Sequence, residues 1–406
     1  MKRYFIFLGI IMFSFMFNLF GQPKSSVKSP AWSYNLNIYE VNLRQFTPSG
    51  TIKEFRTHLP RLKEMGVGIL WFMPIHPIGE KNRKGTLGSY YSVKDYFAVD
   101  PAYGTMDEFK ALVKEIQSMG MYVILDWVAN HTAWDHPLTI TNPEFFTRDS
   151  LGNKMPPVPD WSDVVDLNFD KKEVWKYMYN ALEFWVREVN VDGYRCDVAA
   201  MVPFEFWDEA RKRLDKIKPV FMLAEAEEPK HHIKAFDMSY SWEMHHLWAK
   251  IYREEKKASD IVAELKKEKK KFPKNAFRMR FTTNHDENSW NGTEFEKFGD
   301  GAKTFAVVGA TIPGMFLIYT GQESANKKRL DFFEKDAVKW GNFVSQDFYS
   351  RLNSLKKENK ALWNGEKGGE FINVNNSSPD KILSFIRKKD NNKILVIANL
   401  SRSEEH

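Results

Sequence analysis

The sequence is poor in cysteine: Cys196 is its one thiol in 406 residues, so no disulfide can form within the chain. It has no internal repeat, and its one low-complexity segment is the Lys-rich stretch within residues 253–274. The net charge of +6 is modest for this length, and no nucleic-acid-binding motif accompanies the Lys-rich stretch. We therefore interpret that stretch as a solvated helix face and expect no nucleic-acid partner.

Long hydrophobic runs are also absent, with one exception at the N-terminus. Lys2 and Arg3 precede an almost unbroken apolar run over residues 4–20, and a polar stretch follows Gly21. This order is typical of an export signal, so we expect a signal peptide in residues 1–22 and a periplasmic or extracellular protein. Because the run approaches the length that crosses a bilayer, an uncleaved anchor is the alternative. No integral membrane domain is expected elsewhere.

Short apolar runs of the length of buried strands alternate along the chain with amphipathic helical segments. Hydrophobic residues make up 43% of the sequence, which suffices for a large core. We expect strands within residues 36–43, 67–73, 121–126, 191–197, 219–225, 235–240, 277–286 and 315–319, and helices within residues 59–65, 106–119, 172–188, 204–217 and 344–359. Eight such units in roughly 250 residues predict an α/β fold, the (β/α)8 TIM barrel.

Two segments depart from this alternation. Prolines cluster with Asp and Asn in residues 133–170, which indicates an irregular insert (domain B) after the third strand. Three short alternating runs in residues 361–406 indicate a small antiparallel β module, which looks incomplete or truncated because three strands bury little. We therefore expect the barrel itself to occupy residues 31–132 and 171–360.

Acidic residues close several of the expected strands. Asp197, Glu225 and Asp286 each end one of the apolar runs, and Asp126 ends an earlier one. Because the carboxyl ends of parallel barrel strands meet at one rim, all four side chains should lie on the same rim. A sugar-cleaving barrel needs carboxylates there: one attacks the anomeric carbon, one shuttles a proton and a third can hold the sugar ring as positive charge develops.

Short motifs around these acids strengthen that interpretation. In chain order they occupy residues 91–96, 100–105, 126–131, 166–168, 193–197, Glu225, 284–286 and 321–323. Together, over roughly residues 36–360, they resemble the alpha-amylase family of glycoside hydrolases (family 13), an enzyme family.

The resemblance implies a role for each acid. Asp197 would be the nucleophile that forms a covalent β-glycosyl ester. Arg195 lies two residues earlier on the same strand face, where its charge should hold the pKa of Asp197 down and orient it. Glu225 would act as the acid and then as the base, with the nearby charges of Asp197 and Asp286 favouring its protonated form. Asp286 would grip ring hydroxyls and favour the oxocarbenium-like state.

The same resemblance assigns the binding side chains. His131 and His285 would donate hydrogen bonds to sugar hydroxyls, Tyr91 would stack on the same sugar, and Asp126 would support Arg195 from below. Among the tryptophans, Trp71 and Trp127 are expected in the core. Three others lie in expected loops and are candidates for stacking on sugars: Trp134, Trp161 and Trp290.

No cofactor is expected for the chemistry. A structural calcium ion often lies between barrel and insert in this family, with an asparagine at the position of Asn130 among its ligands. Calcium-binding members often carry a Lys-His pair shortly after the nucleophile, whereas residues 198–202 of this chain read Val-Ala-Ala-Met-Val. Asn130 alone is a weak metal signal, so we predict no metal ligand beyond this single candidate.

The sequence therefore predicts an enzyme that hydrolyses α-1,4-glucosidic bonds in starch, maltodextrins or related α-glucans with retention of configuration. Its partner would be an α-glucan oligosaccharide or polysaccharide. Neighbouring specificities remain alternatives: cyclomaltodextrinase, α-glucosidase or glucan transferase. A non-catalytic amylase-like protein is the competitor from another class, although such proteins need not keep the acids that are present here.

Overall fold

The computed structural model describes residues 22–402. The export signal expected in residues 1–22 therefore lies outside the described residues, apart from Gln22. Within residues 22–402, no helix has both the length and the hydropathy that a bilayer crossing needs.

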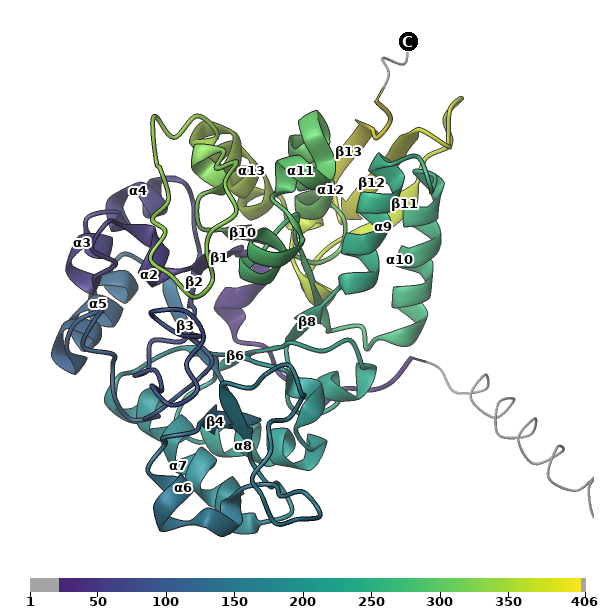
Figure 1. Cartoon of the computed structure of the whole chain (residues 1–406). Coiled ribbons are helices and arrows are strands. Elements are labelled where there is room, and N and C mark those ends of the chain that lie inside the picture. Colours follow the sequence, from purple (N-terminus) through teal and green to yellow (C-terminus); the bar gives the residue numbers. More distant parts are fainter. Residues whose placement is uncertain (1–21, 403–406) are drawn as a thin grey trace, which may run out of the picture.

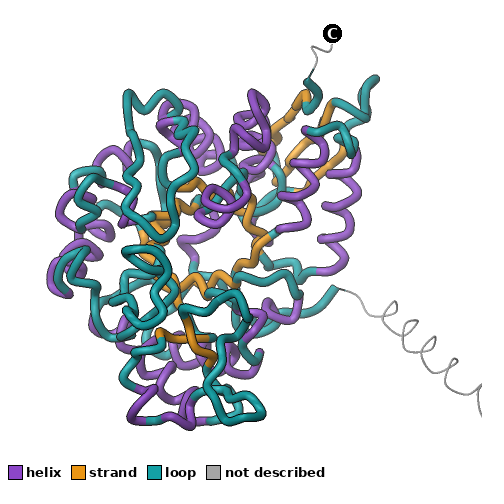
Figure 2. Tube along the Cα trace, in the orientation of Figure 1, coloured by secondary structure: helices purple, strands orange, loops and turns teal. Residues whose placement is uncertain are grey.

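Eight strands close into a barrel at the centre of the molecule (Figures 1 and 2). In barrel order they are β1 (Ile38–Val41), β10 (Met315–Tyr319), β9 (Phe277–Arg280), β8 (Met238–Tyr240), β7 (Phe221–Ala224), β6 (Gly193–Cys196), β3 (Tyr122–Trp127) and β2 (Ile69–Phe72). Every neighbouring pair is parallel, so all carboxyl ends lie at one rim. The predicted (β/α)8 barrel is confirmed.

Side chains of the strands alternate between the barrel interior and the surrounding helix layer. The interior is filled by residues such as Trp71, Ile124, Leu223 and Met279. Cys196 belongs instead to the outer core beneath the helices and is fully buried. Its position follows from the alternation, because the preceding side chain, Arg195, points to the inside of the rim.

Helices surround the barrel on all sides (Figure 1). They are α2 (Leu43–Phe46), α3 (Ile52–Arg56), α4 (Leu59–Glu64), α5 (Met106–Ser118), α7 (Lys172–Glu188), α8 (Phe204–Asp215), α9 (Trp242–Tyr252), α10 (Ser259–Lys271), α11 (Glu294–Phe298), α12 (Ala302–Thr311) and α13 (Gln346–Glu358). The five helices predicted by residue range are present, and the Lys-rich stretch forms α10. The expectations specified no helices at α9, α11 or α12.

Two predicted strands are shorter than expected. The run 36–43 is a strand only over Ile38–Val41, because the side chain of Asn42 caps the short helix α2. The run 277–286 leaves the sheet at Arg280. Further along, the side chain of Asn284 accepts a hydrogen bond from the backbone N–H of Glu287. This bond stabilises the turn into a helical segment (Glu287–Asn291). Asp286 therefore lies at the start of that segment and not at a strand end.

Two small sheets extend the barrel. Within and beside residues 133–170, β4 (His131–Ala133) pairs antiparallel with β5 (Val164–Asp166), and the short helix α6 (Leu138–Thr141) lies between them in sequence. At the C-terminal end, β11 (Glu370–Asn373), β12 (Ile382–Lys389) and β13 (Asn392–Asn399) form the predicted antiparallel sheet. Leu383 and Phe385 of β12 pack with Trp248 and Phe305 of α9 and α12.

A buried carboxyl beside the barrel makes stability depend on pH. Glu294 is almost fully buried and accepts hydrogen bonds from the Thr282 hydroxyl (2.9 Å) and the Gln322 amide (2.6 Å). Burial raises its pKa from 4.5 to about 7 in spite of these bonds. Between those two values the folded protein keeps a proton that the unfolded chain has released, so rising pH weakens folding by up to about 3 kcal/mol.

We expect Glu294→Gln to remove this loss. The free energy of unfolding of the parent should fall relative to that of the variant as pH rises from 5 to 8, with most of the change between pH 5 and 7. Denaturant unfolding of both proteins at each pH measures the difference. A difference that stays constant over this interval would contradict the assignment.

Candidate active site

Arg195 on β6 lies at the centre of the acidic cluster. Its Nη1 donates to Asp126 Oδ1 on the neighbouring strand β3 and to Asp197 Oδ1, each at 2.9 Å. Its Nη2 lies 3.0 Å from Glu225 Oε1, which makes a third ion pair. One fully buried guanidinium therefore holds three carboxylates from three adjacent strands. In the structure Asp126, Asp197 and Glu225 lie together at one rim of the barrel, as predicted.

Aromatic rings fix the position of this guanidinium. The Arg195 carbon Cζ lies 5.2 Å from the Trp71 ring centre, 5.7 Å from that of Tyr91 and 5.6 Å from that of Tyr240. Such contacts stabilise a desolvated cation and leave it no room to turn. Trp71 Nε1 and the Tyr91 hydroxyl also donate to Asp126 Oδ2, each at 3.1 Å, which holds the supporting carboxylate from the other side.

Asp197 follows β6 directly, and 10% of its side chain is exposed. Burial raises the pKa of this carboxyl well above its ordinary value; Arg195 acts in the opposite direction and Glu225 adds to the rise. The expectation that Arg195 would hold the pKa of Asp197 down is therefore corrected: the cation is present, but burial outweighs it. Three carboxylates around one guanidinium repel one another, and this repulsion favours a proton shared among them, as acid catalysis needs.

Glu225 follows β7 directly, and 17% of its side chain is exposed. Its Oε2 accepts a hydrogen bond from the backbone N–H of Val198 at 2.7 Å. Val198 has φ +36° and ψ +46°, a left-handed conformation that a β-branched residue adopts only under strain. The turn after Asp197 is thus bent so that the Val198 N–H orients the Glu225 carboxyl. This is the first residue of the 198–202 stretch that lacks the family's Lys-His pair.

Asp286 lies in the loop after β9, and 35% of its side chain is exposed. His285 Nε2 lies 3.2 Å from Asp286 Oδ2 and 2.8 Å from the Tyr91 hydroxyl, and its Nδ1 contacts Glu40. Burial alone would lower the pKa of His285, but the charges of Asp286 and Glu40 raise it well above 6.5. Burial acts to raise the pKa of Asp286, and the charge of His285 overcomes it and lowers it.

Glu40 is a site residue that the sequence reasoning missed. It is fully buried on β1, and its contact with His285 fixes the imidazole from behind. A signal was present: a carboxylate in the middle of the buried strand Ile38–Val41 needs a charged partner. Tyr240 and Phe332 were also missed; Phe332 packs its ring parallel to that of Tyr91, with centroids 6.3 Å apart.

We expect Glu40→Gln to lower kcat/KM about 10-fold and to change its pH dependence. Removing the carboxylate lowers the pKa of His285, so the imidazole loses its charge at a lower pH. The alkaline limb of the pH profile should therefore shift to lower pH. The measurement is kcat/KM on a maltooligosaccharide from pH 5 to 10. Glu64→Gln, an exposed change of the same kind, is the control. An unmoved alkaline limb would leave Glu40 with a structural role only.

His131 begins β4, at the start of the insert. Its Nε2 is 4.0 Å from Asp197 Oδ2, and burial lowers its pKa to about 3, so it is a neutral donor. Trp161 packs edge-on against it with ring centroids 5.6 Å apart. Of the other predicted stacking candidates, Trp290 is 52% exposed beside Phe332, and Trp134 donates to the Ser162 carbonyl. Trp71 and Trp127 are buried, as expected.

The calcium candidate does not gain ligands in the fold. The amide of Asn130 lies 3.4 Å from Asp166 Oδ1 and 3.4 Å from His131 Nδ1. Residues 22–402 contain no group of three or more His, Cys, Asp or Glu side chains placed to hold a metal ion. One amide beside one carboxylate falls short of the six to eight oxygens that calcium takes, so these side chains do not fit a calcium site by themselves.

The comparisons with known proteins agree with this geometry. A family model described as the alpha amylase catalytic domain matches residues 27–149 and 159–395. The solved structure of a maltogenic alpha-amylase from Thermotoga neapolitana is 33% identical, with a TM-score of 0.82 over 90% of this chain and 86% of that one. An alpha-amylase from Lactobacillus plantarum is 31% identical, with a TM-score of 0.82 over 90% and 88%.

Curated relatives carry more than one kind of name. A 28% identical protein of Picrophilus torridus is named alpha-1,4-glucan:maltose-1-phosphate maltosyltransferase; the match covers 86% of this chain and 59% of that protein. A 24% identical protein of Dictyoglomus thermophilum is named alpha-amylase 2, with 93% and 71% covered. This chain therefore spans only part of the length of several relatives.

Proposed function

The chain belongs to the alpha-amylase family of glycoside hydrolases, and we propose that it cleaves α-1,4-glucosidic bonds of starch, maltodextrins or related α-glucans with retention of configuration. The observation that carries this proposal is the pair Asp197 and Glu225 on one guanidinium, at 2.9 and 3.0 Å from Arg195. Two carboxyl groups about 5–5.5 Å apart give the retaining outcome, and one planar cation bound to both keeps them close.

In the first step the Asp197 carboxylate attacks C1 of the bound glucose. The bond from C1 to the glycosidic oxygen breaks, and the proton held by Glu225 passes to that oxygen, so the leaving chain departs as an alcohol. The product is a β-linked ester on Asp197.

In the second step Glu225 takes a proton from water, and the resulting hydroxide attacks C1. The ester bond to Asp197 breaks and the sugar leaves as the α-anomer, while Glu225 regains its proton. Asp286 and the charged His285 would hold ring hydroxyls of the same sugar, and neutral His131 would donate to another. These contacts strengthen catalysis where they tighten as positive charge develops on the ring.

The anomer released first tests retention. On maltotetraose or maltoheptaose, proton NMR in the first minutes should detect α-product, followed by slow mutarotation to the equilibrium mixture. β-Product appearing first would refute the retaining mechanism. The Asp197→Asn protein under the same conditions serves as the control for contaminating activity.

Transfer to a sugar acceptor is the second candidate, because the 28% identical relative of Picrophilus torridus is named a maltosyltransferase. In that case a sugar hydroxyl or a phosphate replaces water in the second step, and the same residues act. A product time course on maltotriose separates the two: hydrolysis yields only shorter sugars, whereas transfer also yields longer ones. Adding phosphate and looking for maltose 1-phosphate, the compound in the relative's name, tests phosphate as the acceptor.

A further inference from the structure

We propose that residues 4–20 stay in place as the uncleaved anchor, the alternative to a signal peptide, and that the Lys-rich face of α10 docks on the anionic headgroups of the membrane that holds this anchor. This interaction surface is separate from the active site and does not depend on the proposed reaction. Two independent features of the molecule, an uncompensated positive charge and the place where the N-terminal segment leaves the fold, meet at the same helix.

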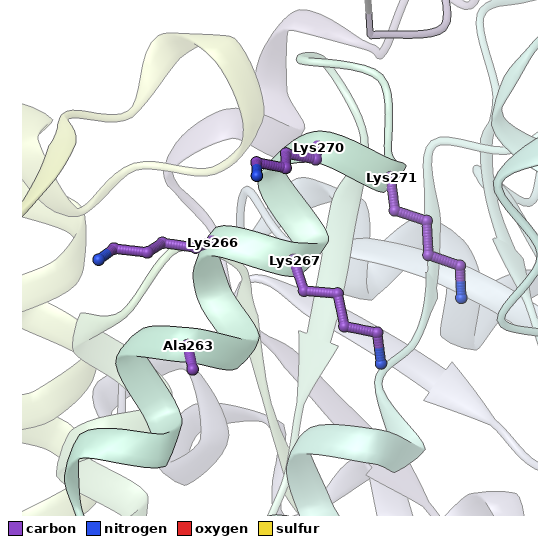
Figure 3. A pocket seen from close by; sticks show the side chains of 5 residues that line it. All are labelled: Ala263, Lys266, Lys267, Lys270 and Lys271. Atoms are coloured by element: carbon purple, nitrogen blue, oxygen red, sulfur yellow. The ribbon is translucent and has the colours of Figure 1, made fainter. Parts of the chain in front are cut away.

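The first feature is the face itself. Figure 3 shows Lys266, Lys267, Lys270 and Lys271 spreading outward around Ala263. The spacing of three and four residues places these side chains on one side of the helix. The opposite side packs inward through Ile261, Leu265 and Glu268. Lys269 and Lys274 are exposed nearby and add positive charge at this end of α10.

The positive charge of this face is largely uncompensated. Glu268 is buried and is paired with Arg280 at 2.5 Å, so it neutralises no surface lysine. Lys267 is paired with Glu243 at 2.7 Å. In the part of the chain that the structure describes, Lys266, Lys269 and Lys270 lie within ion-pair distance of no carboxylate. Three neighbouring exposed positive charges without a carboxylate partner favour binding to an anionic surface over a role as a merely solvated helix face.

The second feature is the path of the N-terminal segment. The side chain of Gln22 donates to the backbone carbonyls of Lys269 and Phe272 at the C-terminal end of α10. Asn275 donates to the Val27 carbonyl at 2.8 Å and holds the following segment against the same region. Figure 1 shows the start of the described chain beside the lower end of α10. Residues 4–20 end only two positions before Gln22.

Together these two features orient the protein with the Lys-rich face of α10 toward the membrane. An almost unbroken apolar run of 17 positions is at the short end of what spans a bilayer, and basic residues next to such a run bind anionic lipid headgroups. Lys24 and Lys28, both exposed, add positive charge to the stretch of chain that follows the run. Because α10 belongs to the helix layer and not to the strand rim, docking leaves Asp197 and Glu225 open to substrate.

A fluorescent label at one position tests the docking. Cys196 is fully buried, so Ala263→Cys supplies the one accessible thiol among the described residues of the full chain. The labelled protein is added to vesicles of phosphatidylcholine alone or with phosphatidylglycerol, and energy transfer to a headgroup dye is measured. The test variant carries Lys266→Gln, Lys269→Gln and Lys270→Gln. The matched control carries Lys53→Gln, Lys63→Gln and Lys114→Gln, which are exposed lysines of α3, α4 and α5. Figure 1 shows these helices across the barrel from α10.

We expect strong transfer with phosphatidylglycerol at about 0.1 M salt and loss of it at about 1 M, where charges are screened beyond about 3 Å. The test variant should dock roughly 100-fold more weakly while staying bound through the apolar run, and the control should behave as the parent. Equal transfer on both vesicle types means that the tether alone places the helix, and overturns the proposal. So does a test variant that matches the control, or a parent that shows no transfer.

Discussion

Replacing Asp197 with Asn should lower kcat on maltooligosaccharides by about 10⁴-fold or more, because the nucleophile that forms the glycosyl ester is lost. The loss should lie in kcat, with KM little changed, since Asp286, His285 and His131 still hold the sugar. Initial rates over a range of substrate concentrations, with the variant purified free of parent enzyme, measure both constants.

The same change should leave the fold intact. Asn keeps the shape of the side chain, and Arg195 keeps its pairs with Asp126 at 2.9 Å and Glu225 at 3.0 Å. Removing one of three carboxylates around a single guanidinium relieves repulsion, so the melting temperature should stay or rise. Asp300→Asn, at an exposed position, is the control. An Asp197→Asn protein with near-parental kcat would contradict the assignment of Asp197 as the nucleophile.

Replacing Glu225 with Gln should produce a loss that depends on the leaving group. On a maltooligosaccharide the first step needs a proton for the departing oxygen, so kcat/KM should fall about 10³-fold. On α-glucosyl fluoride the leaving fluoride needs little protonation, so formation of the ester should slow less than about 10-fold, and its hydrolysis should become rate-limiting. Comparing kcat/KM on the two substrates separates acid catalysis from a general loss of structure.

A positioning role for Glu225 would give a different result, namely an equal loss on both substrates. Glu173→Gln, an exposed change of the same charge, should affect neither. The carboxyl oxygen of Glu225 that accepts from the Val198 N–H can be replaced by the Gln carbonyl oxygen, so the variant keeps that 2.7 Å contact. The strained turn at Val198 should therefore survive the substitution.

The sequence was sufficient to predict the barrel and most of the acidic cluster. Asp126, Asp197 and Glu225 follow from strands whose apolar runs end at a carboxylate, and parallel strands bring such ends together. Asp286 was grouped with them, but the strand that leads to it ends at Arg280 and a capped turn carries it to the cleft. Its position depends on a side-chain hydrogen bond that strand periodicity does not encode.

Other site features depend on tertiary contacts. Glu40 carried a visible signal, a charge inside a buried strand, but its partner His285 lies more than two hundred residues away in sequence. Phe332 lies in the long segment between β10 and α13, which has no periodicity to predict where its side chain packs. The left-handed Val198 runs against the preference of a β-branched residue, so only the surrounding structure imposes it.

The central claim is that Asp197 attacks the sugar while Glu225 manages the proton. The most direct test is mass spectrometry of the Glu225→Gln protein mixed with α-glucosyl fluoride, in which the ester should form and then persist. We predict one glucosyl group on the intact protein and, after peptic digestion at low pH, on the peptide that contains Asp197. A glucosyl group on any other residue, or its absence while fluoride is released at the parental rate, would contradict the account.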